Sequence, residues 1–294
     1  MDGRIGVWHG LFTRAPAREV RAAAVEIENL GYGTLWLSEA PGTKDPYAGA
    51  AVMLAATERI AVGTGIANIW ARDATATAAA SATLAEAFPG RFILGLGVSH
   101  GTIVTSRGHD YAKPLSAMRT YLDDMDSAEV DLPRPERPAP RLLAALRPRM
   151  LELARDRADG VHPYLVPVEH TGLAREIIGP DKLLVPEQAV VVEPDPVRAR
   201  GLAREHLAYY LTLPNYVNNW REFGFTDNDF SGGGSDRLVD ALVVWGDAET
   251  IAKRVHAHLD AGADHVALQP LTPRGSTLAE VTTALHTLAP ALSL

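Results

Sequence analysis

The sequence predicts an α/β fold, a single (β/α)8 TIM barrel that takes up the whole chain, residues 1–294. Three observations predict it. A unit made of an amphipathic helix, a glycine and a short apolar run recurs along the chain. The apolar runs are continuous rather than alternating, as in parallel strands that are covered on both faces. No boundary divides the chain, and its length suits an α/β barrel, which typically takes about 250 residues.

The repeated unit is clearest near the two ends of the chain. The predicted helix at 16–30 ends at Gly31 and is followed by TLWLS, and the predicted helix at 247–261 ends at Gly262 and is followed by HVALQ. Glycine just past a helix end indicates a C-cap, because glycine adopts the left-handed conformation without steric cost.

The other strands and helices are predicted from the same patterns. The helices between them include 74–88, 113–126 and 148–158. A succession of strand and helix without a dinucleotide-domain break favours a closed barrel over an open sheet. The eight predicted strands are RIGVWH (4–9), TLWLS (34–38), IAVGTGI (60–66), FILGLGV (92–98), LLAAL (142–146), GVHPYL (160–165), AVVV (189–192) and HVALQ (265–269).

Two stretches interrupt this rhythm. LPRPERPAP at 132–140 is predicted to be an extended surface connection, because proline fixes φ and lacks an N–H donor. A longer insertion loop before the last strand, at about 213–236, contains NYVNNWREFGF and SGGGSD. Excursions of this length are often lids or binding loops, and a dimer contact is the alternative.

Composition excludes several classes of function. The net charge is −8 with no block of Lys or Arg, so no nucleic-acid partner is expected. The chain has no cysteine, which excludes disulfides, thiolate zinc sites and a cysteine nucleophile and is compatible with a reducing cytoplasm. The first ten residues lack a signal-peptide pattern, and no run of about 18 apolar residues occurs. We therefore expect a soluble, cytoplasmic protein with no membrane partner.

Motifs for metal, acyl and phosphoryl chemistry are missing from the sequence. No metal site is expected, because His256 and His258 are two residues apart on a predicted helix and point to different faces. No serine elbow or P-loop sequence occurs. GLGVSHG resembles a dinucleotide fingerprint, but its second spacing is wrong and no acidic residue ends a strand about 20 residues later.

Residues that directly follow the strands are the candidates for function, because barrel active sites lie at the carboxyl ends of the strands. His100 is the first candidate, since a histidine pKa of about 6.5 suits proton transfer; a structural histidine is the alternative. Glu39 is the second, because partial desolvation at a barrel mouth raises a carboxyl pKa. The alternative to a catalytic role for Glu39 is a structural salt bridge to Lys44 or Arg72.

Small and aromatic residues near the strand ends favour a flat ligand. Gly63, Gly65, Gly95 and Gly97 would let such a ligand approach the backbone, and close packing inside the barrel is the alternative. The pocket is expected to be largely apolar, with its aromatic residues drawn from Trp8, Phe12, Trp70 and Tyr164.

Four segments together resemble the luciferase-like monooxygenase superfamily, and within it the branch that uses the deazaflavin coenzyme F420. They are ENLGYGTLWLSE, ERIAVGTGI, AEAFPGRFILGLGVSH and WGDAETIAKRVHAHLDAGADHVALQ, and the resemblance runs from about residue 5 to 271. It implies an oxidoreductase that transfers a hydride between coenzyme F420 and an unidentified small organic substrate. It also implies a homodimer.

The resemblance implies where the cofactor and the catalytic groups lie. A non-proline cis peptide is expected at Gly65-Ile66, and the backbone before Pro148 is expected to bind a phosphate or tail at a helix N-terminus. Because His100 and Glu39 are predicted on neighbouring strand-end loops, His100 is expected to be the main acid or base, with Glu39 orienting it or sharing its proton. The residues assigned to the cofactor are Ser38, Gly65, Ile66, Ala67, Asn68, Val98, Ser99, Ala145, Leu146, Arg147, His162 and Tyr164.

Two departures from the family pattern leave alternatives open. Relatives often carry a histidine directly after the second strand, where this chain has Ser38 and Glu39, and relatives with sugar-phosphate substrates carry a glutamate where His100 stands. Either the proton-handling pair has exchanged strands or the substrate chemistry differs. The alternative functions are an FMNH2-dependent monooxygenase that uses O2 and a separate flavin reductase, and a non-catalytic flavin-binding barrel.

Overall fold

The strands form one curled sheet in which all the pairs are parallel. The computed structural model describes residues 3–294. Within them the strands are β1 (Ile5–Trp8), β2 (Thr34–Leu37), β3 (Ala61–Thr64), β4 (Ala67–Asn68), β5 (Phe92–Gly97), β6 (Arg141–Leu143), β7 (Gly160–Val161), β8 (Leu183–Leu184), β9 (Glu187–Val192), β10 (Val243–Gly246) and β11 (Val266–Pro270). Their order is β10-β9-β11-β1-β2-β3-β5-β6-β7-β8, with β4 paired to β5.

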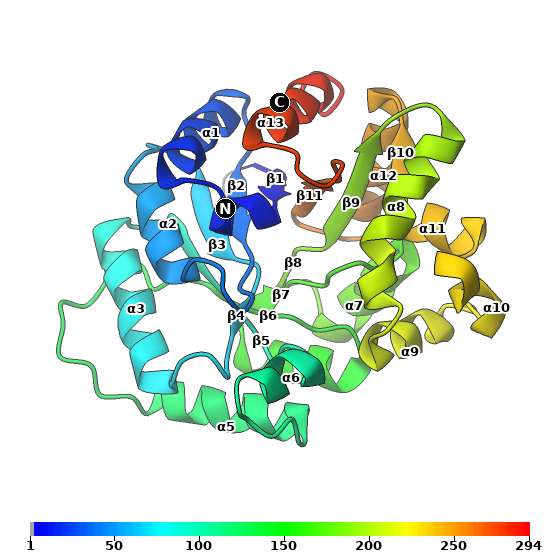
Figure 1. Cartoon of the computed structure of the whole chain (residues 1–294). Coiled ribbons are helices and arrows are strands. Elements are labelled where there is room, and N and C mark those ends of the chain that lie inside the picture. Colours follow the sequence, from blue (N-terminus) through cyan, green and yellow to red (C-terminus); the bar gives the residue numbers. More distant parts are fainter. Residues whose placement is uncertain (1–2) are drawn as a thin grey trace.

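One end of this strand order, β8, leads along the chain into β9, which lies near the other end. Only Val185 and Pro186 separate β8 from β9, while β9 pairs with β11, which pairs with β1. The sheet therefore curls round on itself, and the helices surround it (Figure 1). The predicted α/β class is confirmed, and the sheet is parallel and curled.

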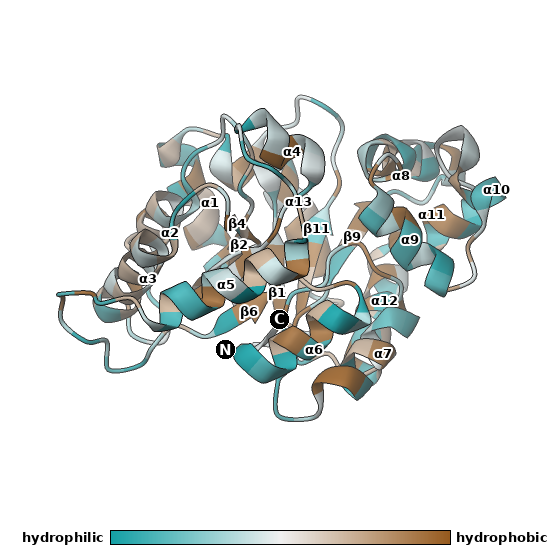
Figure 2. Ribbon diagram, turned by 90° about the horizontal axis from the view of Figure 1, so that it is seen from below, coloured by the Kyte–Doolittle hydropathy of each residue, from teal (hydrophilic) through white to brown (hydrophobic). Residues whose placement is uncertain are grey.

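Helices follow most of the strands and cover the outside of the sheet. They are α1 (Ala17–Asn29), α2 (Pro46–Leu54), α3 (Ala74–Ala87), α4 (Gly101–Ser106), α5 (Pro114–Asp126), α6 (Pro148–Arg157), α7 (Val168–Ile178), α8 (Pro196–Tyr210), α9 (Pro214–Glu222), α10 (Asp227–Phe230), α11 (Asp236–Leu242), α12 (Ala248–Asp260) and α13 (Leu278–Leu288), with short 3-10 turns at Gly10–Thr13 and Ser231–Gly233. Figure 2 shows apolar strands at the centre and helices that carry both apolar and polar stretches.

The predicted elements agree with the structure at most positions. Each of the eight predicted strands overlaps a strand, and Gly31 and Gly262 have φ of +93° and +105°, as expected for helix C-caps. Residues 132–140 contain no helix or strand, as predicted. Strands β4, β8 and β10 were not predicted, and the third predicted run, 60–66, corresponds to β3 alone.

The segment predicted as an insertion loop at 213–236 is mostly helical, so the loop assignment was wrong. Pro214 opens α9, and the Thr226 and Asp229 side chains form a capping box that starts α10. The side chains of Trp220 and Phe225 are buried in a second core cluster with residues of α8 and α11. Burial of these aromatic residues stabilises the helices against the sheet.

The interior of the curled sheet is filled by large side chains opposite glycines. Trp36 is fully buried and its ring stacks on His162, with 4.7 Å between the ring centroids. A Cβ at Gly63 would lie 2.4 Å from the Trp36 ring, and one at Gly95 would lie 1.9 Å from the carbonyl oxygen of Thr64. At these two glycines the packing alternative holds, because the space that a side chain needs is already occupied.

Candidate active site

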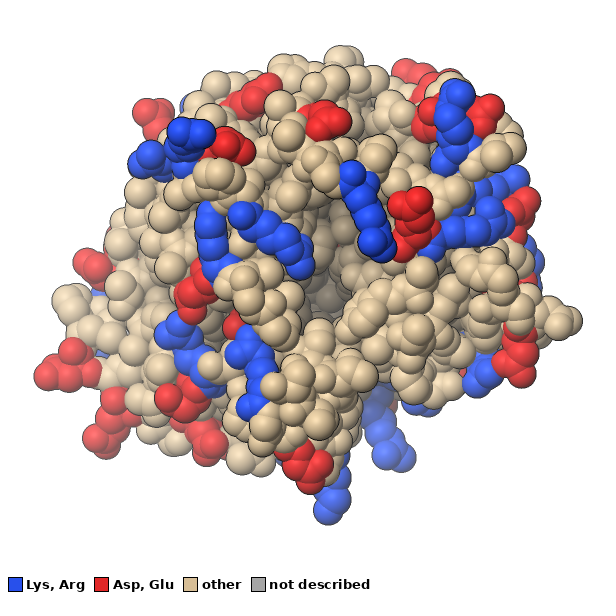
Figure 3. Space-filling model, viewed as in Figure 1, with Lys and Arg blue, Asp and Glu red and all other residues tan. Residues whose placement is uncertain are grey.

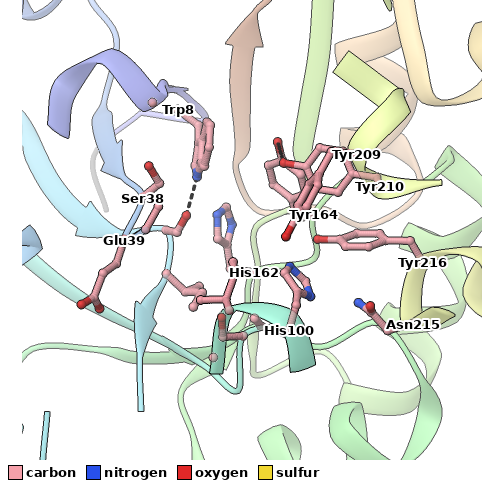
Figure 4. Close-up of a pocket in the computed structure, with 18 of the residues that line it drawn as sticks. Trp8, Ser38, Glu39, His100, His162, Tyr164, Tyr209, Tyr210, Asn215 and Tyr216 are labelled. Atoms are coloured by element: carbon pink, nitrogen blue, oxygen red, sulfur yellow. Dashed lines mark hydrogen bonds between the residues drawn. The ribbon is translucent and has the colours of Figure 1, made fainter. Parts of the chain in front are cut away.

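A cavity of about 1410 Å³ opens at the carboxyl ends of the strands. Its walls come from residues that follow β1, β2, β3, β5, β6, β7 and β11, and from α8 and α9. Figure 3 looks into this hollow, and Figure 4 shows side chains that line it. Active sites of (β/α)8 enzymes lie at this end of the strands.

Most of the residues that the sequence analysis assigned to the site line this cavity. Ala67 and Asn68 do not; both are buried in β4. Those that line it are Ser38, Glu39, Gly65, Ile66, Val98, Ser99, His100, Ala145, Leu146, Arg147, His162 and Tyr164.

Aromatic side chains hold the backbone at the ends of β3 and β5. The Gly65-Ile66 peptide bond is cis, as expected, and Trp8 Nε1 donates a hydrogen bond of 2.6 Å to the Gly65 carbonyl. Trp70 Nε1 donates to the Val98 carbonyl at 3.1 Å, and the Tyr111 hydroxyl donates to the Ser99 carbonyl at 3.2 Å. Aromatic side chains therefore bond three carbonyls of the backbone that borders the cavity, and two of these side chains, Trp8 and Tyr111, line the cavity themselves.

His100 lies just before α4 and borders the cavity. Its Nδ1 is buried without a hydrogen-bond partner in the described structure, and its ring lies 5.6 Å from the Tyr216 ring, centroid to centroid. Burial lowers the pKa of His100, and a side-chain hydrogen bond with Asn215 partly opposes this. The imidazole is thus mainly neutral at pH 7, which leaves one ring nitrogen free to accept a proton.

Glu39 does not contact His100, so the expected orienting or proton-sharing contact is absent from the structure of residues 3–294. Its carboxylate accepts a 2.8 Å hydrogen bond from the Asn68 N–H and lies 3.6 Å from Arg107. Figure 4 shows it turned away from His100. Burial raises the pKa of Glu39, while Asn68 and Arg107 act in the opposite direction.

Glu39 also does not form the salt bridge to Lys44 or Arg72 that the sequence analysis considered. Lys44 Nζ donates to the Ala15 carbonyl, and Arg72 pairs with Asp45. Arg107, at the end of α4, takes the place of both as the partner of Glu39. The carboxylate therefore links the loop after β2 to β4 and to α4.

Four tyrosines form one side of the cavity, and three of them are the main residues that sequence reasoning missed. This tyrosine wall consists of Tyr164, Tyr209, Tyr210 and Tyr216, of which only Tyr164 was assigned (Figure 4). The Tyr210 hydroxyl donates to the Tyr164 hydroxyl at 3.0 Å, which donates to Gln269 at 2.8 Å. Burial raises the pKa of Tyr164, Tyr210 and Tyr216 well above the ordinary value, so all three hydroxyls stay protonated.

His162 provides a buried hydrogen-bond acceptor at the cavity. Its Nδ1 lies 2.7 Å from the Val185 carbonyl, and because a carbonyl only accepts, Nδ1 carries the proton. Nε2 has no partner among the described residues, and burial lowers the His162 pKa to about 4. Nε2 is therefore a buried acceptor that has no partner among the described residues.

Glu187, at the start of β9, is a buried carboxyl group close to the tyrosine wall. Oε2 accepts a 2.9 Å hydrogen bond from the Leu165 N–H, whereas Oε1 is buried without a partner in the described structure. Burial raises the pKa of Glu187 from 4.5 to about 8, and its charge would also raise the pKa of Tyr164, Tyr210 and Tyr216. The group is therefore protonated in the folded protein at neutral pH.

Replacing Glu187 with glutamine is expected to stabilise the protein increasingly as the pH rises from 4.5 to about 8. The folded chain keeps the proton up to about pH 8, whereas the unfolded chain releases it above 4.5, so wild-type stability falls across this interval. Urea unfolding at both ends of the interval measures the difference. Glu86→Gln, at an exposed position on α3, controls for the lost charge; a pH-independent difference for Glu187→Gln would contradict the prediction.

Searches for metal-binding groups and membrane spans find none in the part of the chain that the structure describes. No three His, Asp or Glu side chains there lie together as metal ligands would. No helix in residues 3–294 has the length and apolar character to cross a bilayer.

Known proteins that resemble this chain include enzymes that use a flavin or a deazaflavin. 5,10-Methylenetetrahydromethanopterin reductase of Methanolobus tindarius is 25% identical over 88% of this chain and 92% of its own length. An F420-dependent secondary alcohol dehydrogenase, solved with an F420-acetone adduct, superposes with a TM-score of 0.76 at 15% identity, covering 99% of each chain. The FMN-bound oxygenating constituent of 3,6-diketocamphane monooxygenase from Pseudomonas putida superposes with a TM-score of 0.71 at 15% identity, covering 99% of this chain and 98% of its own.

The family description "luciferase-like monooxygenase" matches residues 4–265, which is most of the chain. The match spans the strands from β1 to β10 and all the loops that line the cavity except the one after β11. This chain belongs to the luciferase-like monooxygenase family.

Proposed function

We propose that this protein is an F420-dependent oxidoreductase that transfers a hydride between the coenzyme and a small organic substrate. The observation that carries the proposal is His100, a neutral imidazole with an unpartnered nitrogen beside a large cavity at the strand ends. The F420-dependent secondary alcohol dehydrogenase, which was solved with an F420-acetone adduct, supports the choice of coenzyme.

The residues of the cavity fit a flat ring with an anionic tail. Gly65 and Gly97 border the cavity at the ends of β3 and β5, and the His162 Nε2 acceptor needs a partner. The N-terminus of α6 has no capping side chain, and Arg147 and Arg149 lie beside it in the cavity wall. Free N–H groups at a helix start and guanidinium groups both suit a phosphate or carboxylate.

When bound, coenzyme F420 would supply a deazaflavin carbon that accepts or donates a hydride, which accounts for the two electrons that the substrate loses or gains. The protein supplies the proton that must move with it. His100 would take the proton from a substrate hydroxyl during oxidation and return it to a carbonyl oxygen during reduction. Tyr216 and Tyr209 beside the His100 ring would keep water from it.

Glu39 has a different role in this proposal from the one expected from sequence. Because it binds the Asn68 N–H and Arg107, it would hold β4 and the loop after β2 in place. We propose it as a positioning residue. We further propose that the whole chain is one (β/α)8 domain, in which β8 and β9 count as one strand, and that it acts as a homodimer.

Calorimetric titration of the protein with coenzyme F420 and with FMN, each oxidised and reduced, tests the cofactor. We expect micromolar binding of F420 and weaker binding of FMN. Preference for reduced FMN, together with a product that requires O2, would support the alternative, an FMNH2-dependent monooxygenase served by a separate flavin reductase. A flavin-binding barrel without catalysis would bind a cofactor and turn over no substrate, and binding of neither cofactor would contradict both assignments.

A further inference from the structure

The cavity is cationic although the chain is acidic. Its described walls contain the side chains of Arg14, Lys113, Arg147, Arg149 and Arg274 but a single carboxylate, Glu39, which already binds Arg107. The whole chain has a net charge of −8. Figure 3 shows several Lys and Arg side chains around the mouth of the hollow. Such separation of charge favours an anionic ligand at this mouth.

The cations fall into two groups on different sides of the cavity. Lys113, Arg147 and Arg149 follow β5 and β6, which pair with each other. Arg14 and Arg274 follow β1 and β11, which also pair. Strands β2 and β3 lie between the groups in the sheet. The tail of one coenzyme accounts for the first group, at the start of α6, and leaves the second without a role.

Arg14 and Arg274, which we call the β1/β11 arginine pair, make few contacts that would stabilise the fold. Neither forms a salt bridge with any residue that the structure describes, and the one side-chain hydrogen bond of Arg14 is a 3.3 Å contact with the Gly10 carbonyl. Both side chains line the cavity. Exposed guanidinium groups at a cavity mouth are available to bind a carboxylate or phosphate in a bidentate manner.

The charge of Arg14 reaches the tyrosine wall. Burial lowers the pKa of His9 to about 4 and raises the pKa of Tyr210, and the positive charge of Arg14 lowers the pKa of both groups. His206, on α8 near His9, is kept neutral because burial lowers its pKa to about 4. The side of the cavity below the arginine pair is therefore aromatic and uncharged, whereas its rim is cationic.

We propose that the β1/β11 arginine pair binds the carboxylate or phosphate group of the substrate, whose flat apolar body packs on the tyrosine wall with its reacting carbon toward His100. The substrate class is thus an aromatic or similarly flat organic acid or phosphate ester. This inference rests on the proposed function only in assigning the ligand as the substrate of a hydride transfer; the anion site itself stands on the cavity residues.

Binding of small probes to the F420-loaded protein tests the site. Phenyl phosphate and phenylacetate are the anionic probes, and benzyl alcohol is the neutral one. We expect the double variant Arg14→Gln/Arg274→Gln to lose about tenfold or more in affinity for at least one anion, because the charge-assisted hydrogen bonds of both guanidinium groups are lost. Its affinity for benzyl alcohol should change by less than about twofold. The anion that shows the loss identifies the carboxylate or the phosphate class.

Arg149→Gln is the matched control on the other side of the cavity. It should weaken binding of F420 and leave the anionic probes unchanged, and Arg274→Lys should retain part of their affinity. The proposal is overturned if wild-type protein binds neither anion, if the double variant binds both like wild type, or if the double variant weakens only F420. Titration of the apo protein separates the two claims: pair-dependent anion binding without F420 binding would refute the proposed function and leave the anion site standing.

Discussion

The His100→Ala variant is expected to lower kcat/KM for hydride transfer by about 10²–10⁴-fold, the usual contribution of a general acid or base. The reason is that the unpartnered Nδ1 of His100 is buried in the described structure, close to Tyr216 and Tyr209, with no second imidazole or carboxylate bonded to it. Coenzyme binding should change little, because the α6 N-terminus, Arg147 and Arg149 are untouched. Steady-state kinetics and titration with F420 measure the two effects separately.

The pH profile provides an independent check on His100. Substrate oxidation needs the neutral imidazole, and burial lowers the pKa of this group below 6.5. Activity should therefore persist below pH 6.5 and fall only when the pH is lowered further, through the lowered pKa of His100. This loss of activity at acid pH should be absent from the pH profile of His100→Ala. Glu39→Gln is the control, since Glu39 does not contact His100. Turnover of His100→Ala within about threefold of wild type, with coenzyme still bound, would show the assignment to be wrong.

The Gly95→Ala variant is expected to destabilise the fold by about 1–3 kcal/mol or more, as overpacking of a filled core does. A Cβ at Gly95 would lie 1.9 Å from the Thr64 carbonyl oxygen, which belongs to the backbone of β3. The Thr64 hydroxyl also donates to the Gly95 carbonyl at 2.7 Å and accepts from the Gly95 N–H at 2.8 Å. The methyl group would push β3 and β5 apart where they border the cavity.

Gly172→Ala, on α7, is the matched control for this substitution. A Cβ at Gly172 meets nothing within 4 Å among the described residues, and the position is helical. Alanine should therefore stabilise the protein by about 0.4–1 kcal/mol. Urea unfolding of both variants measures the contrast, and equal stability of Gly95→Ala and wild type would mean that the strands tolerate a wider separation.

The curled sheet could be predicted because its signals are local. Gly31 and Gly262 mark helix ends through their own conformational freedom, and continuous apolar runs mark buried strands. The two-residue strand β8 is too short to give such a run, and β10 follows α11, the short helix that comes after the segment predicted as a loop. The helices of that segment had signals of their own, in Pro214 and in the spacing of Thr226 and Asp229. The glycine-rich stretch SGGGSD in the same segment is instead typical of a loop.

Site residues were predictable where the topology alone places them. Any residue just after a parallel strand reaches the same end of the sheet, so His100 and Ser99 could be placed without knowing their contacts. The direction of the Glu39 side chain could not, because it depends on the Asn68 N–H and Arg107. The tyrosine wall depends on how α8 and α9 pack over the sheet, although His206, Tyr209 and Tyr210 share a face by their helical spacing.

The bonds that hold the Gly65, Val98 and Ser99 carbonyls have a consequence for the thermodynamics of ligand binding. A loop that must become ordered around its ligand loses conformational entropy, and that loss is subtracted from the affinity. Here three aromatic side chains already fix the backbone that borders the ligand. The protein therefore gives up little chain freedom when a flat ring enters, and most of the free energy of the new contacts is retained as affinity.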